Sequence, residues 1–349
     1  MIDKKVILLI CGVILTGSIE HISIPLMVTY FNSLYFIIMT SSLHGCLNFG
    51  FLLLLLTKGQ FRKPREIKTT LLAGSFNAIM SMCFIYSANP ERTPVMIQSI
   101  FLGLAILPTV IFRKYIIHKI ITYDRNYIIP SLSLLILSII LVMIPLLNQQ
   151  YDWSKSYWIL GYILAIILLS LDGTLQEKYI IDTNDNTLTN KISFAFYTSL
   201  CQVMTLIMMF WIEYIFGYTN TPFNAFFESA KIFVSNFWTF CILELFIIDC
   251  LVLYLLTVHL NSISTNYNMI LTNLTNQSVA IFFIIFPQLN HGIQYPIFIV
   301  ICSLILNIIS VFLWMKGEKN KQIPSMVSSN DISLEEFNEK NFDYYEYNN

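Results

Sequence analysis

The most constraining feature of this sequence is a succession of apolar stretches that are each about 20 residues long. A helix of that length crosses the hydrocarbon core of a bilayer. Charged residues make up only 12% of the chain, about half the usual share in soluble domains. We therefore expect an all-α integral membrane protein with ten transmembrane helices. The expected spans are 6–28, 35–57, 69–88, 94–112, 128–147, 157–177, 192–216, 236–258, 265–287 and 294–315.

Basic residues are distributed unevenly over the connections between these spans. With ten spans, every Lys and Arg except Arg92, Lys155 and Lys231 falls on one side of the membrane. Cytosolic loops carry such an excess of positive charge, so we expect both termini in the cytosol. The net charge of −1 gives no indication of a nucleic-acid partner.

Ten spans with both ends on one side divide into two halves of five, 1–150 and 151–316. Because five is odd, the second half must be inserted upside down relative to the first, as in many secondary transporters. Residues 222–234 carry apolar side chains at helical spacing and should form an amphipathic helix along the membrane surface. The acidic tail, 317–349, is expected to be a disordered cytosolic segment.

Three of the acids within expected spans are candidate functional groups, because an ionisable side chain is expensive there. Glu20 precedes His21 in the first span, Asp172 lies in the sixth, and Asp249 lies near the middle of the eighth. Burial disfavours the charged form of a carboxyl group, so these acids are candidates for proton or cation coupling. For Glu20, the alternative interpretation is a structural partner for a neighbouring helix or a pair with His21 near the membrane interface.

Uncharged polar residues within the spans are candidates for a substrate pathway, with interhelical hydrogen bonding as the alternative. A polar stripe at intervals of four residues in the ninth span favours a water-facing or substrate-facing surface. The candidates are His44, Asn77, Gln98, Ser99, Asn268, Thr272 and Asn276.

The motifs of several other function classes are missing from the sequence. There is no phosphate-binding loop, nucleophile elbow or zinc-protease motif, so we expect neither an enzyme nor an ATP-driven pump. The seven cysteines lie inside apolar runs and not at metal-ligand spacing. We expect no metal and no cofactor, and partners limited to a small-molecule substrate and the lipid bilayer.

Two stretches carry a resemblance to a known family. The stretch R-T-P-V-M-I-Q-S-I-F-L-G-L-A-I-L-P at 92–108 resembles the fourth span of the chloroquine-resistance-transporter-like family, within the drug/metabolite transporter superfamily. The matching residues are Arg92, Thr93, Ile97, Gln98, Ser99 and, one place late, Pro108. The stretch 246–267 is similar to the family's eighth and ninth spans at Asp249, Tyr254, Ser264, Thr265 and Tyr267.

The resemblance implies a 5+5 inverted repeat around a central cavity that opens alternately to each side. It also implies export of small cationic or amphipathic solutes, amino acids, peptides or thiols from an acidic vacuole. The expected location is therefore a vacuolar, lysosomal or other endomembrane.

Three hypotheses about function follow. The first is a secondary transporter that moves a small organic solute by alternating access, with proton coupling through Asp249, Asp172 or Glu20. The second is a nucleotide-sugar carrier of the same superfamily, because L-D-G-T-L-Q-E-K-Y at 171–179 looks like a motif of some of those carriers. Such a carrier needs basic groups for the diphosphate, and the spans contain almost none. The third is a non-transporting membrane receptor or scaffold, which leaves the acids within the spans unexplained.

Overall fold

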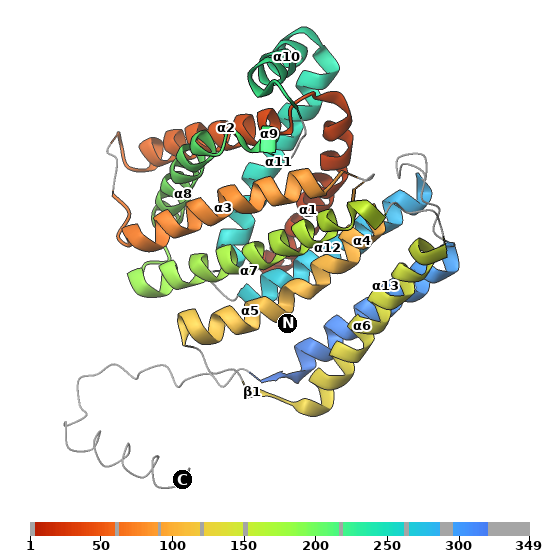
Figure 1. Ribbon diagram of the computed structural model, residues 1–349. Helices are drawn as coiled ribbons and strands as arrows, with labels where there is room; N and C mark the ends of the chain where they lie inside the picture. Colours follow the sequence, from red (N-terminus) through yellow and green to blue (C-terminus); the bar gives the residue numbers. More distant parts are fainter. Residues whose placement is uncertain are drawn as a thin grey trace, which may run out of the picture.

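The computed structural model describes residues 4–59, 63–89, 92–118, 122–148, 153–215, 219–261, 265–286 and 296–319. These residues are almost entirely helical (Figure 1). The helices are α1 (Lys4–Tyr30), α2 (Leu34–Leu56), α3 (Ile67–Ser87), α4 (Val95–Phe101), α5 (Ile106–Phe112), α6 (Arg125–Asn148), α7 (Tyr157–Thr183), α8 (Leu188–Met208), α9 (Ile212–Ile215), α10 (Pro222–Ser235), α11 (Phe237–Asn261), α12 (Thr265–Ile285) and α13 (Ile297–Gly317).

Three short helical turns and one pair of strands complete the described structure. A 3₁₀ turn, η1 (Leu102–Ala105), joins α4 to α5, and a π turn, η2 (Arg113–Ile117), extends α5, while η3 (Trp153–Lys155) precedes α7. Strands β1 (Thr122–Tyr123) and β2 (Glu318–Lys319) pair antiparallel. This pairing joins the end of α13 to the chain that enters α6.

The predicted class, an all-α membrane protein, agrees with the structure. In the described part of the chain, eight helices are long and apolar enough to cross a membrane: α2, α3, the segment Ile97–Ile117, α6, α7, α8, α11 and α13. The protein is therefore a multi-pass membrane protein. The first and ninth expected spans are helical as α1 and α12, but neither is among these eight helices. Ten spans thus stay a prediction.

The seventh expected span, 192–216, has different bounds in the structure. Helix α8 begins earlier, because the side chain of Thr187 accepts a hydrogen bond from the N–H of Asn190 and caps the helix start. It ends at Met208, and the short helix α9 follows separately. The predicted disordered tail falls almost wholly on residues after Lys319, outside the described residues.

Helix α10 occupies the segment expected to be an amphipathic surface helix. Phe226 packs on Tyr35 and Phe36 at the start of α2, while Phe223 and Phe227 remain exposed. The carboxylate of Glu213 in α9 is fully buried, and it accepts hydrogen bonds from the hydroxyl of Ser33 and the N–H of Tyr35. These contacts fix the connection between α8 and α11 against the start of α2.

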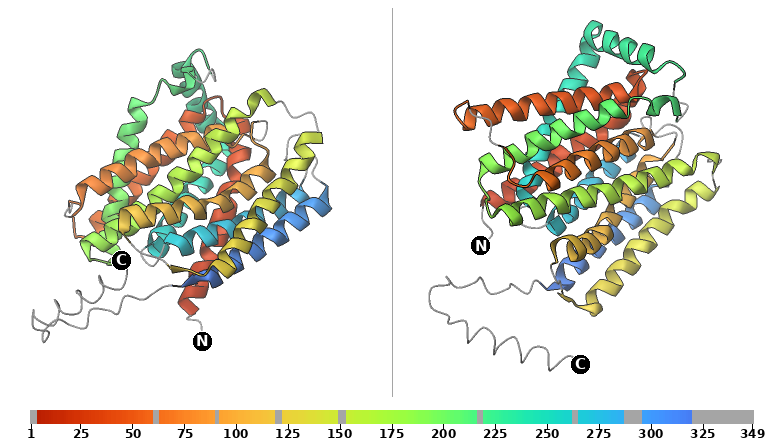
Figure 2. Two further views of the ribbon diagram at one scale, coloured as in Figure 1. Left: turned by 60° about the horizontal axis from the view of Figure 1, so that its bottom comes forward. Right: turned by 60° about the vertical axis from the view of Figure 1, so that its left-hand side comes forward.

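Long helices pack around a centre formed by α3, α7, α1 and α11. Helix α7 packs against α3 and α5, α8 packs against α2 and α3, and α1 packs against α11 and α12. Helices α6 and α13 form a pair at one edge of the molecule in every view (Figures 1 and 2). Ser131 and Ser310 each donate to the other's carbonyl oxygen at 2.7 Å across this pair, a common way to join helices in a membrane.

We expect Gly74→Ala to destabilise the fold because Gly74 sits where α3 meets the backbone of α8. An added Cβ would lie 2.5 Å from the carbonyl oxygen of Thr198 and 2.6 Å from Cβ of Cys201. Such overpacking costs about 1–3 kcal/mol, and thermal unfolding in detergent would measure it. Gly45→Ala is the matched control, because its Cβ would meet no atom nearer than 3.9 Å. Equal unfolding temperatures for the two variants would contradict the close contact between α3 and α8.

Candidate functional site

A cavity of about 260 Å³ lies among seven helices: α1, α2, α3, α7, α8, α11 and α12. Its lining includes apolar side chains such as Ile24, Ile38, Phe84, Ile85 and Phe246. Carboxyl, amide and hydroxyl groups also line it. The polar lining residues used below are Glu20, Asn77, Ser81, Asp172, Gln176, Gln202, Tyr254, Asn261, Asn268 and Thr272.

The charge of this cavity has one sign. Glu20 and Asp172 line it, whereas no Lys or Arg is among its lining residues in the described part of the chain. His21 is the basic side chain among them. A carboxylate surrounded by apolar helices favours a cation, because the attraction between opposite charges grows as water is excluded.

Asp172 belongs to a relay of side chains that joins α7 to α11. The amide nitrogen of Gln176 donates to Oδ2 of Asp172 at 2.8 Å, and the amide nitrogen of Asn261 donates to Oε1 of Gln176 at 2.7 Å. Asp172 and Gln176 are four residues apart and therefore share one face of α7. The relay fixes the direction of the carboxylate at the cavity wall.

Glu20 and Asp249 lie at the contact between α1 and α11. Sγ of Cys250 is 3.9 Å from Oε1 of Glu20, and Asp249 directly precedes Cys250 on α11. Asp249 is buried but is not among the residues that line the cavity. The structure thus brings two of the three predicted coupling acids together and holds Asp172 on another helix.

Three of the predicted pathway residues, Asn77, Asn268 and Thr272, line the cavity. Asn77 accepts a hydrogen bond from Ser81 at 3.4 Å, and Gln202 donates to the same serine hydroxyl. The hydroxyl of Thr272 donates to the backbone carbonyl of Asn268. The side chain of Asn276, a fourth predicted pathway residue, lies outside the described residues.

Gln98 and Ser99 do not line this cavity; they line a small pocket of about 10 Å³ that shares His21 with it. The amide nitrogen of Gln98 donates to the backbone carbonyls of Ala88 and Thr93 at 2.9 and 2.6 Å, and Ser99 donates to the carbonyl of Val95. These bonds close the turn between α3 and α4. The polar side chain therefore satisfies carbonyl oxygens that the turn leaves without helical donors.

His44 also lies outside the cavity lining. Its Nε2 is 4.0 Å from Oε1 of Glu244, with both side chains about one-third exposed, and its Nδ1 is 3.0 Å from the carbonyl oxygen of Thr40. These contacts connect α2 with α11 on the outer side of the helices. The predicted pathway role of His44 thus has no support from its position.

One ionic contact differs from what the sequence indicates. Glu177 is next to Lys178 near a span end, which is typical of a solvated pair, and Arg113 ends the fourth expected span. In the structure, Glu177 and Arg113 are 1% and 2% exposed and form a pair, with Nε of Arg113 3.1 Å from Oε2. Lys178 pairs instead with Asp182. Because Arg113 and Glu177 are 64 residues apart in the chain, the sequence around each residue does not indicate that they pair.

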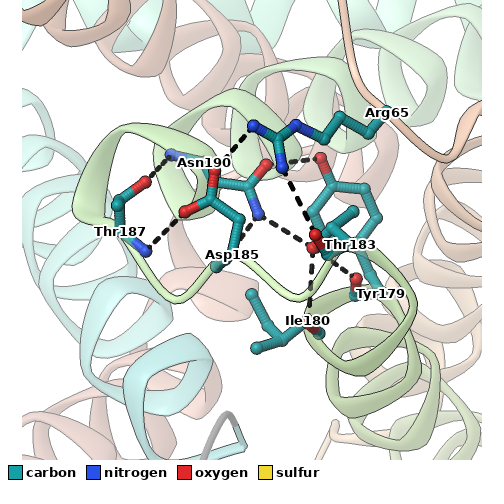
Figure 3. A network of polar contacts seen from close by, with 7 residues as sticks. All are labelled: Arg65, Tyr179, Ile180, Thr183, Asp185, Thr187 and Asn190. Carbon is teal, nitrogen blue, oxygen red and sulfur yellow. Dashed lines mark hydrogen bonds and ion pairs between the residues drawn. The ribbon is translucent and has the colours of Figure 1, made fainter. Parts of the chain in front are cut away.

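A second polar network lies at the turn between α7 and α8 (Figure 3). Arg65, which precedes α3, contacts Oδ2 of Asp185 at 3.1 Å and donates to the carbonyl of Thr183 at 3.3 Å. Asn190 donates to the backbone carbonyl of Asp185 and accepts from the hydroxyl of Tyr179. Because Arg65 is largely exposed, this network joins two connections at the surface and does not belong to the cavity.

Sequence reasoning missed several residues of the cavity. Ser81, Gln202 and Asn261 line it, yet none was singled out. Gln202 offers the clearest signal, because an amide in the middle of an apolar span is expensive. Asn261 lies at the very end of α11, where a polar residue is ordinary, so its place in the cavity is recognised only from its contact with Gln176.

A scan against protein-family models and a search of curated proteins found no match to this chain.

Proposed function

We propose that this protein is a secondary transporter of the drug/metabolite type that moves a small organic cation across an endomembrane by alternating access. The observation that carries the proposal is the cavity among membrane helices with carboxyl groups and no Lys or Arg in its described lining. Acids within spans are expensive and mark ion or substrate pathways. A scaffold that only binds other proteins has no use for such a cavity.

The pairing of helices supports ten spans arranged as a 5+5 inverted repeat. If α1, α2, α3, α4–α5 and α6 correspond to α7, α8, α11, α12 and α13, most packed pairs have a counterpart. The α3–α7 contact matches α11–α1, the α3–α8 contact matches α11–α2, and the α1–α12 contact matches α7–α5. The α2–α8 and α6–α13 contacts each join two helices that correspond to one another, so each contact is its own counterpart. An internal two-fold relation produces this pattern.

The same relation pairs the polar groups of the cavity. Glu20 and Asp172 lie at nearly the same place along α1 and α7, which both have 27 residues. Asp249 is the central residue of α11, and Asn77 is the central residue of α3. The carboxyl groups of Glu20 and Asp172 therefore come from equivalent places in the two halves, as expected for a site at the repeat interface.

We propose different roles for the acids. Asp172 is oriented by Gln176 and faces the cavity, so it binds the cationic substrate. Glu20 and Asp249 both lie at the contact between α1 and α11, and two neighbouring carboxyl groups favour binding one proton between them. That pair is the element through which a proton gradient drives transport. The endomembrane location and the cytosolic termini rest on the family resemblance and on the distribution of basic residues.

The size and charge of the cavity favour a small cation over a nucleotide sugar. A volume of about 260 Å³ is slightly below the usual range of small-molecule sites, about 300–1,000 Å³. A diphosphate would also require basic groups. Moreover, the Glu177 carboxylate in the motif that resembles nucleotide-sugar carriers is already paired with Arg113.

Uptake into proteoliposomes tests the proposal. Purified protein would be reconstituted with a pH gradient in either direction, and the substrates offered would be lysine, small cationic peptides, glutathione and UDP-sugars. We expect uptake of cations that reverses with the gradient and is absent from protein-free liposomes. Gradient-independent exchange of UDP-sugars, or no uptake of any cation, would contradict it.

A further inference from the structure

We infer that Asp172, Asn261 and Asn268 form a subsite for the primary ammonium group of the substrate. The inference rests on the proposed function and narrows its substrate class. Oδ1 of each of these three residues is buried and receives no hydrogen bond from any described residue. The residues are 5%, 1% and 4% exposed, come from α7, α11 and α12, and line the same cavity.

The carboxylate of Asp172 sets the polarity of this subsite. An ionised carboxylate only accepts hydrogen bonds, so Gln176 must turn its amide nitrogen toward Asp172. Oε1 of Gln176 then faces Asn261, which must turn its own amide nitrogen toward it. Oδ1 of Asn261 is thereby left as a free acceptor. The orientation of both amides follows from one negative charge.

Buried acceptors without hydrogen-bond donors indicate which chemical group the site binds. Leaving a buried acceptor unsatisfied costs about 1–3 kcal/mol, and together these oxygens require donors. A primary ammonium group carries three N–H donors and no acceptor. Its positive charge also neutralises the negative charge of the Asp172 carboxylate. Hydrogen bonds between charged groups of this kind are about twice as strong as neutral ones.

The rest of the cavity argues for an organic amine and against a metal ion. Its volume of about 260 Å³ equals that of roughly nine water molecules in the liquid, far more than one ion occupies. The lining of the cavity also includes Phe84, Phe246 and Ile85, which suit an apolar body. A quaternary ammonium group has the same charge but no donor, so the three oxygens would stay unsatisfied around it.

Thermal unfolding of the full chain in detergent tests the subsite with three probes that share one body. These are 2-phenylethylamine, its N,N,N-trimethyl derivative and the neutral 2-phenylethanol, each titrated in buffers with sodium or with potassium chloride. A ligand at free concentration L that binds only the folded state stabilises it by RT ln(1 + L/Kd), so a titration of the unfolding temperature reports the Kd of each probe. We expect at least tenfold tighter binding of the primary amine than of either other probe, in both salts.

Substitutions test whether Asn261 and Asn268 cause the preference for the primary amine. Asn261→Leu and Asn268→Leu should each weaken binding of the primary amine about tenfold and leave binding of the trimethyl derivative unchanged. Asn48→Leu is the matched control, because Asn48 is exposed on α2 and should change neither affinity. If a variant fails to fold, the comparison of the three probes on the unmodified chain still decides.

Each remaining result would overturn the subsite. These are equal affinities for the primary and the trimethyl probes, stabilisation by sodium alone, or stabilisation by none of the probes. The proposed function fails separately. Selective amine binding without any uptake into proteoliposomes would refute the transporter and keep the subsite, whereas uptake that accepts quaternary cations equally would do the reverse.

Discussion

Replacing Asp172 by Asn will reduce uptake of organic cations about a hundredfold or more, without unfolding the protein. The substitution removes the negative charge that binds the substrate, and loss of one partner of a buried charge pair costs about 2–5 kcal/mol. Asn has nearly the same volume and keeps an oxygen that can accept from Gln176, which now donates to Asp172 at 2.8 Å. Initial rates of uptake, corrected for the amount of folded protein, measure the effect.

Asp182→Asn is the control for this result. Asp182 is on the same helix and pairs with Lys178 at the exposed end of α7, so its neutralisation should leave uptake unchanged. Equal uptake by the Asp172→Asn variant and the unmodified protein would show that the cavity carboxylate does not bind the substrate. Equal loss in both variants would indicate a general effect of charge on α7.

Replacing Glu177 by Leu will strongly destabilise the fold. The change removes the carboxylate that both Nε and Nη2 of Arg113 contact at 3.1 Å. Breaking a buried ion pair from one side costs about 3–5 kcal/mol, because a charge stays buried without its partner. The unfolding temperature in detergent should therefore fall by several degrees or more.

The double variant Arg113→Met with Glu177→Leu distinguishes the loss of a pair from the loss of packing. Replacing both partners by apolar residues is often neutral or stabilising, so most of the lost stability should return. Asp182→Leu, at the partly exposed Lys178–Asp182 pair, should cost less than about 1 kcal/mol. A double variant as unstable as Glu177→Leu would contradict the assignment of the effect to the buried charge.

The lengths of the apolar stretches predicted the helices well, because membrane insertion depends on a local property, the composition of about 20 consecutive residues. Structural helices lie at all ten expected ranges within the described part of the chain. The cost of an acid within a span singled out Glu20 and Asp172, which both line the cavity. That cost applies whatever the neighbours are, so one sequence is enough to find such residues.

Side-chain direction could not be predicted in the same way. Gln98 and Asn77 are equally polar in the sequence, yet Gln98 turns back to the carbonyls of Ala88 and Thr93, whereas Asn77 lines the cavity. Arg113 was expected at the membrane surface, and its burial depends on Glu177 on another helix. In each case the decisive partner is set by tertiary packing.

Counterflow in proteoliposomes tests the central claim, a carrier with alternating access, most directly. Liposomes that contain the purified protein would be loaded with millimolar unlabelled amine and diluted into micromolar labelled amine, with no pH gradient. A carrier that releases an unlabelled molecule outside returns with a labelled one. We therefore expect the label to accumulate transiently inside the liposomes above its equilibrium level. Simple equilibration without an overshoot, or no entry at all, would contradict it.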